Sequence, residues 1–252
     1  MDLAIQVASN SQGLSRLAAE QVVRSAVEAV RDKGLFTFVL AGGSTPKNLY
    51  SLLASCNEPF RAQLPWDSIH FFWGDERHVP PDHPDSNYRM ALEAMLSGVP
   101  VPSENIHRIK SENRVAASAA DEYEETLREF FRLTEGQLPR FDLILLGIGP
   151  DAHMASIFPG SHSINEKNRL VVAPWVDKFK SSRITLTPPV LNNAAAVIFL
   201  VTGAEKAKAL HEVLEGEYQP ERFPAQLIRG NKGRVLWLVD RQAAMMLRHT
   251  QS

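Results

Sequence analysis

The stretch "FDLILLGIGPDAHMASIFPGS", residues 141–161, joins an apolar run to a polar loop that contains glycines. The run "FDLILLGI" (141–148) is short and nearly all apolar, which is typical of a strand covered on both faces of a parallel sheet. The loop after it carries an acid, Asp151, and a histidine, His153. Either the glycines form a nucleotide-binding loop, or His153 acts as a base at the mouth of the strand.

The hexapeptide "GIGPDA" (147–152) matches the dinucleotide fingerprint G-x-G-x-x-[GA]. That fingerprint needs a long helix to begin inside it. Here "HMASIFPG" (153–160) permits at most about two helical turns before Pro159-Gly160 ends them, which counts against a nucleotide. A histidine can take a proton from water near neutrality, and a nearby carboxylate can orient it. The residues alone leave His153 as either a general base or a structural histidine.

Similar apolar runs alternate with helical patterns along the chain, which predicts an α/β protein with a mostly parallel sheet. The lack of repeats and low-complexity linkers favours one domain over residues 1–252, with room for a small subsidiary lobe. Strands are expected at 35–41, 69–73, 141–148, 169–175, 183–187, 195–202 and 234–240. Helices are expected at 14–34, 88–98, 114–134, 204–216 and 241–249. A further helix is expected to follow the strand at 35–41, with Thr45 as its cap and Pro46 in its first position.

Bulk composition excludes several classes of protein. The 252 residues carry a formal net charge of −2, so no basic excess suggests a nucleic-acid partner. One cysteine, Cys56, cannot form an internal disulfide and fits a reducing compartment. No apolar stretch approaches the roughly 20 residues that span a bilayer, and the first residues lack the pattern of a signal peptide. The expected location is therefore the cytoplasm, with no membrane partner.

A glycine-rich turn follows the strand at 35–41. In "AGGSTP" (41–46), Gly42 and Gly43 allow close approach of the backbone to a ligand. Ser44 and Thr45 offer hydroxyls and amides at a helix start, where a phosphate would fit. The spacing is not that of a P-loop. The alternative is a tight turn before a capped helix.

A charged segment follows the strand at 69–73. The polar, proline-rich loop "GDERHVPPDHPDSN" (74–87) begins with Asp75, Glu76 and Arg77, which form either a solvated charge run or part of a site at the edge of the sheet. His78 and His83 match no strong pattern of metal ligands, so no metal site is predicted.

Two further cations lie near expected strand or helix ends. Arg183 begins the strand at 183–187. Lys206 lies in the first turn of the helix at 204–216, where its charge opposes the helix dipole. Lys206 is either a tolerated surface residue or part of an anion site.

Taken together, these stretches resemble the 6-phosphogluconolactonases and, more distantly, the glucosamine-6-phosphate deaminases of the same fold family. The resemblance covers most of the chain in the family's order. The matching segments are "LAGGSTPKNLY" (40–50), "FFWGDERHVPPDHPDSNYRMA" (71–91), "DLILLGIGPDAHMASIFPGS" (142–161), "SSRITLTPPVLNNA" (181–194) and "FLVTGAEKA" (199–207).

The resemblance implies a Rossmann-like three-layer α/β/α fold, no metal or nucleotide cofactor, and hydrolysis of 6-phosphogluconolactone in the pentose phosphate pathway. Carried over to this chain, it makes His153 the general base, with Asp151 beside it in the site. The 42–45 loop, Arg183 and Lys206 would bind the phosphate, and Asp75 would also lie in the binding site. Arg77 would lie near the sugar or lactone end, unless it pairs with Asp75 or Glu76. The expected oligomeric state is a monomer or weak homodimer.

The catalytic loop departs from the family at two positions. The family usually reads Asp-Gly-His-Thr-Ala-Ser, whereas here Ala152 replaces the glycine and Met154 the threonine. If the family loop has a positive φ at that glycine, the alanine costs about 1 kcal/mol or more. The threonine's hydroxyl contact is lost.

Two alternative functions remain. The deaminases resemble "MDEY" where this chain has "WGDER", and they carry a glutamate before the proline of the loop, where this chain has Phe158. The missing acid argues against sugar ring opening and amine loss. A phosphosugar-binding protein without catalysis is the other alternative, and the presence of both Asp151 and His153 argues weakly against it.

Overall fold

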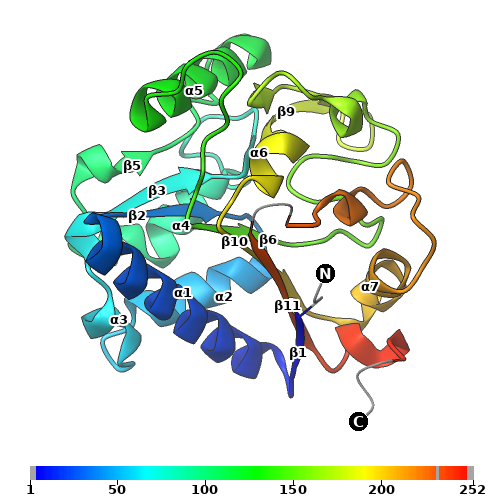
Figure 1. Ribbon diagram of the computed structural model, residues 1–252, viewed down its shortest axis with the longest axis horizontal. Coiled ribbons are helices and arrows are strands. Elements are labelled where there is room, and N and C mark those ends of the chain that lie inside the picture. The colour runs from blue at the N-terminus through cyan, green and yellow to red at the C-terminus, as the bar shows by residue number, and fades with distance from the viewer. Residues whose placement is uncertain (1–3, 231–232, 249–252) are drawn as a thin grey trace.

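The protein is described by a computed structural model that covers residues 4–230 and 233–248 (Figure 1). In these ranges, seven parallel strands form a central sheet in the order β1-β11-β10-β6-β2-β3-β5, and a smaller antiparallel sheet has the order β4-β9-β7, with β8 also paired to β9. The strands are β1 (Ala4–Ala8), β2 (Phe36–Leu40), β3 (Ile69–Trp73), β4 (Asp75–Arg77), β5 (Ile106–His107), β6 (Leu143–Leu146), β7 (Val171–Val172), β8 (Trp175–Val176), β9 (Ser181–Leu186), β10 (Ala196–Val201) and β11 (Arg234–Asp240). The α-helices are α1 (Ser11–Lys33), α2 (Ser44–Ala54), α3 (Phe60–Gln63), α4 (Asn87–Ala94), α5 (Ala116–Phe131), α6 (Pro188–Asn192) and α7 (Ala207–Leu214).

The helices cover both faces of the central sheet. The steps β1-β2, β2-β3 and β3-β5 run one way across the sheet, so right-handed crossovers place α1, α2 and α4 on one face. The connections from β5 to β6, from β6 to β10 and from β10 to β11 run across the sheet in the opposite direction, and they place α5, α6 and α7 on the opposite face. Figure 1 shows α1 and α2 on one side of the sheet and α5, α6 and α7 on the other. The predicted α/β fold with a mostly parallel sheet is confirmed.

Local sequence explains the first helix. The side chain of Asn10 caps α1 by accepting a hydrogen bond from the amide of Gly13 at 2.8 Å. Leu14 and Val22 are among the side chains that α1 buries against the sheet. Gly34 then adopts a φ of 82°, a left-handed conformation that ends the helix at low cost.

The direction of winding reverses between β6 and β2, which are neighbours in the sheet. The chain leaves β2 toward β3 and leaves β6 toward β10, so the two loops diverge at their carboxyl ends. Open α/β sheets bind ligands in the crevice at such a reversal. The turn after β2 and the catalytic-loop candidate after β6 therefore meet at one place.

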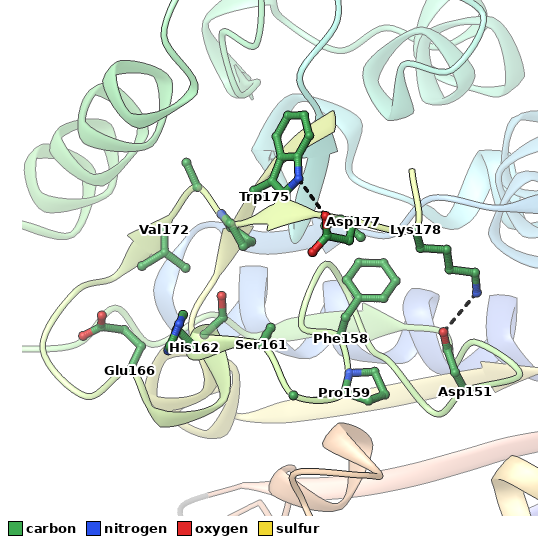
Figure 2. A pocket seen from close by; sticks show the side chains of 15 residues that line it. Asp151, Phe158, Pro159, Ser161, His162, Glu166, Val172, Trp175, Asp177 and Lys178 are labelled. Atoms are coloured by element: carbon green, nitrogen blue, oxygen red, sulfur yellow. Dashed lines mark hydrogen bonds and ion pairs between the residues drawn. The ribbon is translucent and has the colours of Figure 1, made fainter. Parts of the chain in front are cut away.

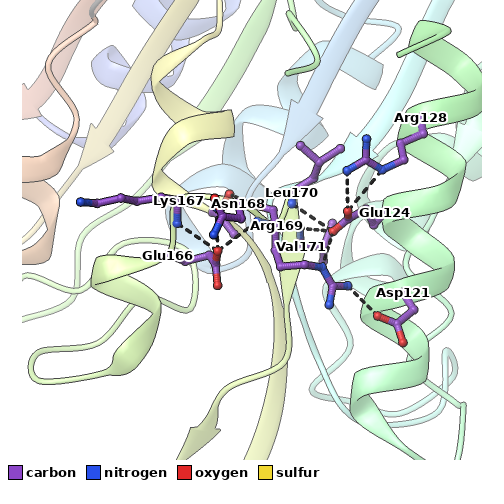
Figure 3. A network of polar contacts seen from close by, with 10 residues as sticks. Asp121, Glu124, Arg128, Glu166, Lys167, Asn168, Arg169, Leu170 and Val171 are labelled. Atoms are coloured by element: carbon purple, nitrogen blue, oxygen red, sulfur yellow. Dashed lines mark hydrogen bonds and ion pairs between the residues drawn. The ribbon is translucent and has the colours of Figure 1, made fainter. Parts of the chain in front are cut away.

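The smaller sheet is fastened to α5 by a buried carboxylate, as Figure 3 shows. Glu124 of α5 accepts hydrogen bonds from the side chains of Arg128 and Arg169, both at 2.8 Å, and from the amides of Leu170 and Val171. The two amides are at the start of β7, so the bonds hold this sheet against the helix. That contact fixes β9, the strand that carries Arg183.

Four expectations about the elements are wrong, and one strand was not expected. The loop expected at 74–87 begins with β4, because its backbone pairs with β9. Thr45 does not cap α2: Gly43 precedes the helix, Pro46 is its third residue, and the Thr45 hydroxyl bonds to that of Thr202 at 2.7 Å.

The strand expected at 169–175 is two short strands, β7 and β8, which both pair with β9. Two further corrections lie near the termini. Residues 4–8 form an edge strand that was not expected, although four of the five residues of "AIQVA" are apolar. The helix expected at 241–249 is a single 3₁₀ turn, Ala243–Met246, and its last expected residue lies outside the described ranges. Among the described helices, none combines the length and apolarity needed to cross a membrane.

Candidate active site

A cavity of about 200 Å³ opens at the carboxyl ends of β2, β3 and β6. It brings together residues that are far apart in sequence, most of which lie in β4 or just after strands of the central sheet. The predicted site residues that line it are Gly42, Gly43, Asp75, Arg77, His153 and Lys206.

Asp151 and His153 form a tight pair beside this cavity. Nδ1 of His153 lies 2.5 Å from a carboxylate oxygen of Asp151. Because an ionised carboxylate only accepts hydrogen bonds, Nδ1 must be the donor, which leaves the lone pair on Nε2. The other carboxylate oxygen accepts from Nζ of Lys178 at 3.1 Å. The bond from His153, together with Lys178, lowers the pKa of Asp151 well below its usual range, so the carboxylate stays charged.

The loop that presents this pair is tightly turned. The amide of Gly149 donates to the carbonyl of His153, and the amide of Ala152 donates to that of Gly149, both at 2.9 Å. Ala152 has a φ of 60° and is fully buried. The alanine at this position therefore occupies a left-handed conformation, which was the condition for a backbone cost at Ala152.

A buried polar cluster forms the floor near β4. Asp75 accepts a hydrogen bond from the hydroxyl of Ser156 at 2.6 Å, and its carbonyl accepts from the side-chain amide of Asn87 at 2.9 Å. A Cβ placed on Gly42 would lie 2.1 Å from an oxygen of Asn87. Gly42 is therefore needed so that the β2 turn can pass close to this amide.

Glu76 serves the fold and lies away from the cavity. Its carboxylate accepts hydrogen bonds from the hydroxyl of Ser86 and from the amides of Asn87 and Tyr88. These bonds give partners to amides in the first turn of α4, which have none within the helix. Burial raises its pKa, although these amides oppose the change. The "GDER" segment thus contains one structural acid between two residues that line the cavity.

Three cations stand at or beside the cavity. Arg77 of β4 lies opposite Arg183 of β9 in the antiparallel register. The Arg77 side chain donates to the carbonyl of Asp85 at 2.8 Å and does not pair with Asp75 or Glu76. Among the described residues, neither Arg183 nor Lys206 forms an ion pair.

Both unpaired cations are partly buried. Burial lowers the pKa of Arg183, and the neighbouring charge of Arg77 lowers it further. Burial also lowers the pKa of Lys206, which Glu205 and Asp151 partly offset. Arg77 and Arg183 are like charges held close together, so an anion bound between these two would relieve their repulsion.

Several predicted residues lie outside the cavity lining. Ser44 and Thr45 do not border it, although both stand at the start of α2 beside Gly43. Asp151 and Arg183 do not border it either, but they lie against His153 and Arg77, which do. His78 bonds to the carbonyl of Asn113 and His83 to the amide of Asp85. Nowhere in the described ranges do three His, Cys, Asp or Glu side chains gather as a metal ion would require.

A second, larger groove of about 720 Å³ adjoins the pair, and Figure 2 shows its lining. Asp151, from the loop after β6, and Lys178, from the turn between β8 and β9, both border the groove and form an ion pair. Phe158 also borders the groove, and its ring stacks on that of His153 with the centroids 4.2 Å apart.

Sequence reasoning assigned no role to Asn87, Ser156 or Lys178. Asn87 was visible only as part of the "SN" that follows "GDER". Ser156 and Lys178 reach Asp75 and Asp151 across 81 and 27 residues of sequence, and no local pattern reports such contacts.

Comparisons with known proteins agree with this geometry. Residues 9–237 match the family described as glucosamine-6-phosphate isomerases/6-phosphogluconolactonase. A protein of Synechocystis sp. named 6-phosphogluconolactonase is 42% identical over 97% of this chain and 98% of its own length. A protein of Arabidopsis thaliana named 6-phosphogluconolactonase 3, chloroplastic, is 39% identical over 86% of this chain and 67% of its own.

A solved structure of 6-phosphogluconolactonase from Trypanosoma brucei superposes with a TM-score of 0.87 at 31% identity, covering 98% of this chain and 99% of that one. The match spans the central sheet, the smaller sheet and the loops that carry the candidate site. The resemblance that the motifs predicted is confirmed, and the chain belongs to the family of glucosamine-6-phosphate isomerases and 6-phosphogluconolactonases.

Proposed function

We propose that the protein is an enzyme that hydrolyses 6-phosphoglucono-1,5-lactone to 6-phosphogluconate, the lactonase step of the pentose phosphate pathway. The observation that carries the proposal is the Asp151–His153 pair, 2.5 Å apart, beside a cavity bordered by cations without carboxylate partners. The names of the full-length relatives support the same reaction. A lactone is an activated ester, so the reaction needs only a base and stabilisation of charge.

In the proposed reaction, Nε2 of His153 takes a proton from water while the water oxygen attacks the lactone carbonyl carbon. The carbonyl electron pair moves to its oxygen, and backbone amides beside the cavity are proposed to stabilise that negative charge. When the pair returns, the bond to the ring oxygen breaks. The imidazolium then gives its proton to that oxygen, and Asp151 keeps the ring oriented throughout.

The phosphate is proposed to lie between Arg77 and Arg183. Their register places the two guanidinium-bearing residues side by side, and the repulsion between them favours a dianion there. Lys206 and the amides at the start of α2, from Gly43 to Thr45, add positive potential. Arg77, which the resemblance placed near the lactone end, is thus assigned here to the phosphate together with Arg183.

A lactonase assay tests the proposal. Purified protein with EDTA should accelerate the loss of freshly generated 6-phosphogluconolactone above its spontaneous hydrolysis. Glucosamine 6-phosphate is assayed in parallel for release of ammonia. Ammonia release without lactonase activity would assign the deaminase function instead, and tight binding of the lactone without turnover would assign a binding protein.

The setting of the enzyme is part of the proposal. We propose a cytoplasmic monomer or weak homodimer with a small-molecule substrate and no nucleic-acid partner, since the net charge of −2 gives no attraction to polyanions. Several plant relatives are named chloroplastic, whereas the names of the Synechocystis and Nostoc relatives give no location. Sedimentation at micromolar concentration measures the oligomeric state.

A further inference from the structure

The aromatic ring of Phe158 makes closer contact with the candidate base than any other ring in the described chain. Its centroid lies 4.2 Å from that of His153, and the two planes are inclined by 25°. Phe158 is 9% exposed, so solvent reaches little of this contact. The side chain thus covers one face of the imidazole while Asp151 binds its edge.

The position of Phe158 is held by its own loop. The amide of Ile157 donates to the carbonyl of Met154 at 2.8 Å, and the amide of Gly160 donates to the carbonyl of Glu221 at 2.9 Å. The ring of Phe179, from the turn between β8 and β9, packs edge-on against Phe158 with centroids 5.9 Å apart. A residue supported on both sides in this way can restrain its neighbour.

The bond to Asp151 alone does not fix the imidazole plane. A hydrogen bond to Nδ1 anchors one atom of the ring, and the ring can still tilt about that bond. Stacking on Phe158 restricts the tilt, so the direction of the Nε2 lone pair is set by the two contacts together. Small misplacements of a catalytic group are costly for rate.

The same contact acts on charge. When His153 holds the proton taken from water, the ring becomes a cation that lies against the electron-rich face of Phe158. Aromatic faces attract cations, more strongly where water is excluded. An aliphatic side chain of similar size would fill the space without this attraction.

We propose that Phe158 is a positioning residue for the reaction, whose stacked ring fixes the plane of His153 and stabilises its protonated form. This inference rests on the proposed role of His153 as the base. It assigns to the aromatic ring a contribution to kcat rather than to substrate affinity, because Phe158 contacts the base and acts on the substrate through it.

The test compares Phe158→Leu, which keeps an apolar side chain without a ring, with Phe158→Tyr, which keeps the ring. Phe158→Leu should lower kcat about 5- to 30-fold and leave KM within about threefold, whereas Phe158→Tyr should keep at least about half of the wild-type kcat. Phe60→Leu removes a similarly buried ring in α3, away from the site, and serves as the matched control. Circular dichroism and thermal melting confirm folding of each variant.

A double-mutant cycle separates positioning from a general structural role. In a His153→Asn background the base is gone, so adding Phe158→Leu should cost less than about twofold in kcat. The inference is overturned if Phe158→Leu keeps the wild-type kcat, or if its full penalty persists in the His153→Asn background. Absence of lactonase activity from the wild-type protein would instead reject the proposed function.

Discussion

Replacing Gly149 with alanine should disable the candidate base while leaving the fold intact. A Cβ built on Gly149 would lie 2.0 Å from Nδ1 of His153, 2.2 Å from its Cε1 and 2.4 Å from a carboxylate oxygen of Asp151. Ordinary van der Waals contact begins near 3.4 Å, so the imidazole would have to move by more than about 1 Å. The backbone of Gly149 is held by its hydrogen bond to the carbonyl of His153 and cannot move away easily.

A displacement of about 1 Å of a catalytic group costs roughly 10²-fold in rate, or about 2.7 kcal/mol in the activation free energy. We therefore expect Gly149→Ala to lower kcat about 100-fold in the lactonase assay. The displaced side chains of His153 and Asp151 are partly exposed and lose only their hydrogen bond and the stacking contact with Phe158, so the melting temperature should fall only slightly. Gly147→Ala, whose Cβ would meet only the carbonyl of Leu200 at 3.8 Å, is the control for kcat; it also borders the cavity, so KM is measured separately. A Gly149→Ala variant with wild-type kcat would refute the placement of His153 and Asp151.

Three other perturbations test separate parts of the account. Arg183→Ala should raise KM about 10- to 150-fold for the phosphorylated lactone, because a charge-assisted contact contributes roughly 1.5–3 kcal/mol. Unphosphorylated gluconolactone should be a poor substrate of the wild type, and equal turnover of the two lactones would count against the phosphate site. Ala152→Gly relieves about 1–2 kcal/mol of backbone strain in the folded state. It also loses about 0.8 kcal/mol of methyl burial and about 0.5–1 kcal/mol because the unfolded chain becomes freer, so the free energy of unfolding in urea should change by less than about 1 kcal/mol. A larger gain in stability would mean that the native alanine strains the loop more than its φ suggests. Burial lowers the pKa of His70 and, with His70 nearby, that of His107 to about 4, so both rings are neutral in the native state and the unfolded chain binds their protons first. Stability should therefore fall by about 1–2 kcal/mol, allowing for partial solvent screening, as pH drops from the ordinary histidine value of 6.5 toward 4; urea titrations at pH 7 and pH 5 measure this loss, and His107→Phe should reduce it.

The parts of the fold that the sequence predicted are those set by local pattern. Phe36–Leu40 and Ala196–Val201 are wholly buried strands, and Thr37 is the one polar residue in the two sequences. The strand Ala4–Ala8 lies at the edge of the sheet with only Ala8 buried, and Gln6 interrupts its five residues, so its apolar run is too short to stand out as a strand. The strand Asp75–Arg77 is polar because it pairs at the rim of the sheet beside the cavity.

The candidate site was predictable to the extent that it follows strand ends. Asp151, His153 and Lys206 come just after strands of the parallel sheet, so their convergence follows from topology. The stacking of Phe158 on His153 depends instead on a turn with a left-handed alanine, and Lys178 reaches Asp151 from the smaller sheet. Contacts of this kind are decided by tertiary packing, which no periodicity in the sequence encodes.

The most direct test of the account is the rate of His153→Asn in the lactonase assay. Asparagine can still accept and donate hydrogen bonds near Asp151, but it cannot take a proton from water. If His153 is the base, kcat should fall about 10²- to 10⁴-fold, while KM stays within about threefold and circular dichroism matches the wild type. A folded His153→Asn variant that retains near-wild-type kcat would contradict the central claim.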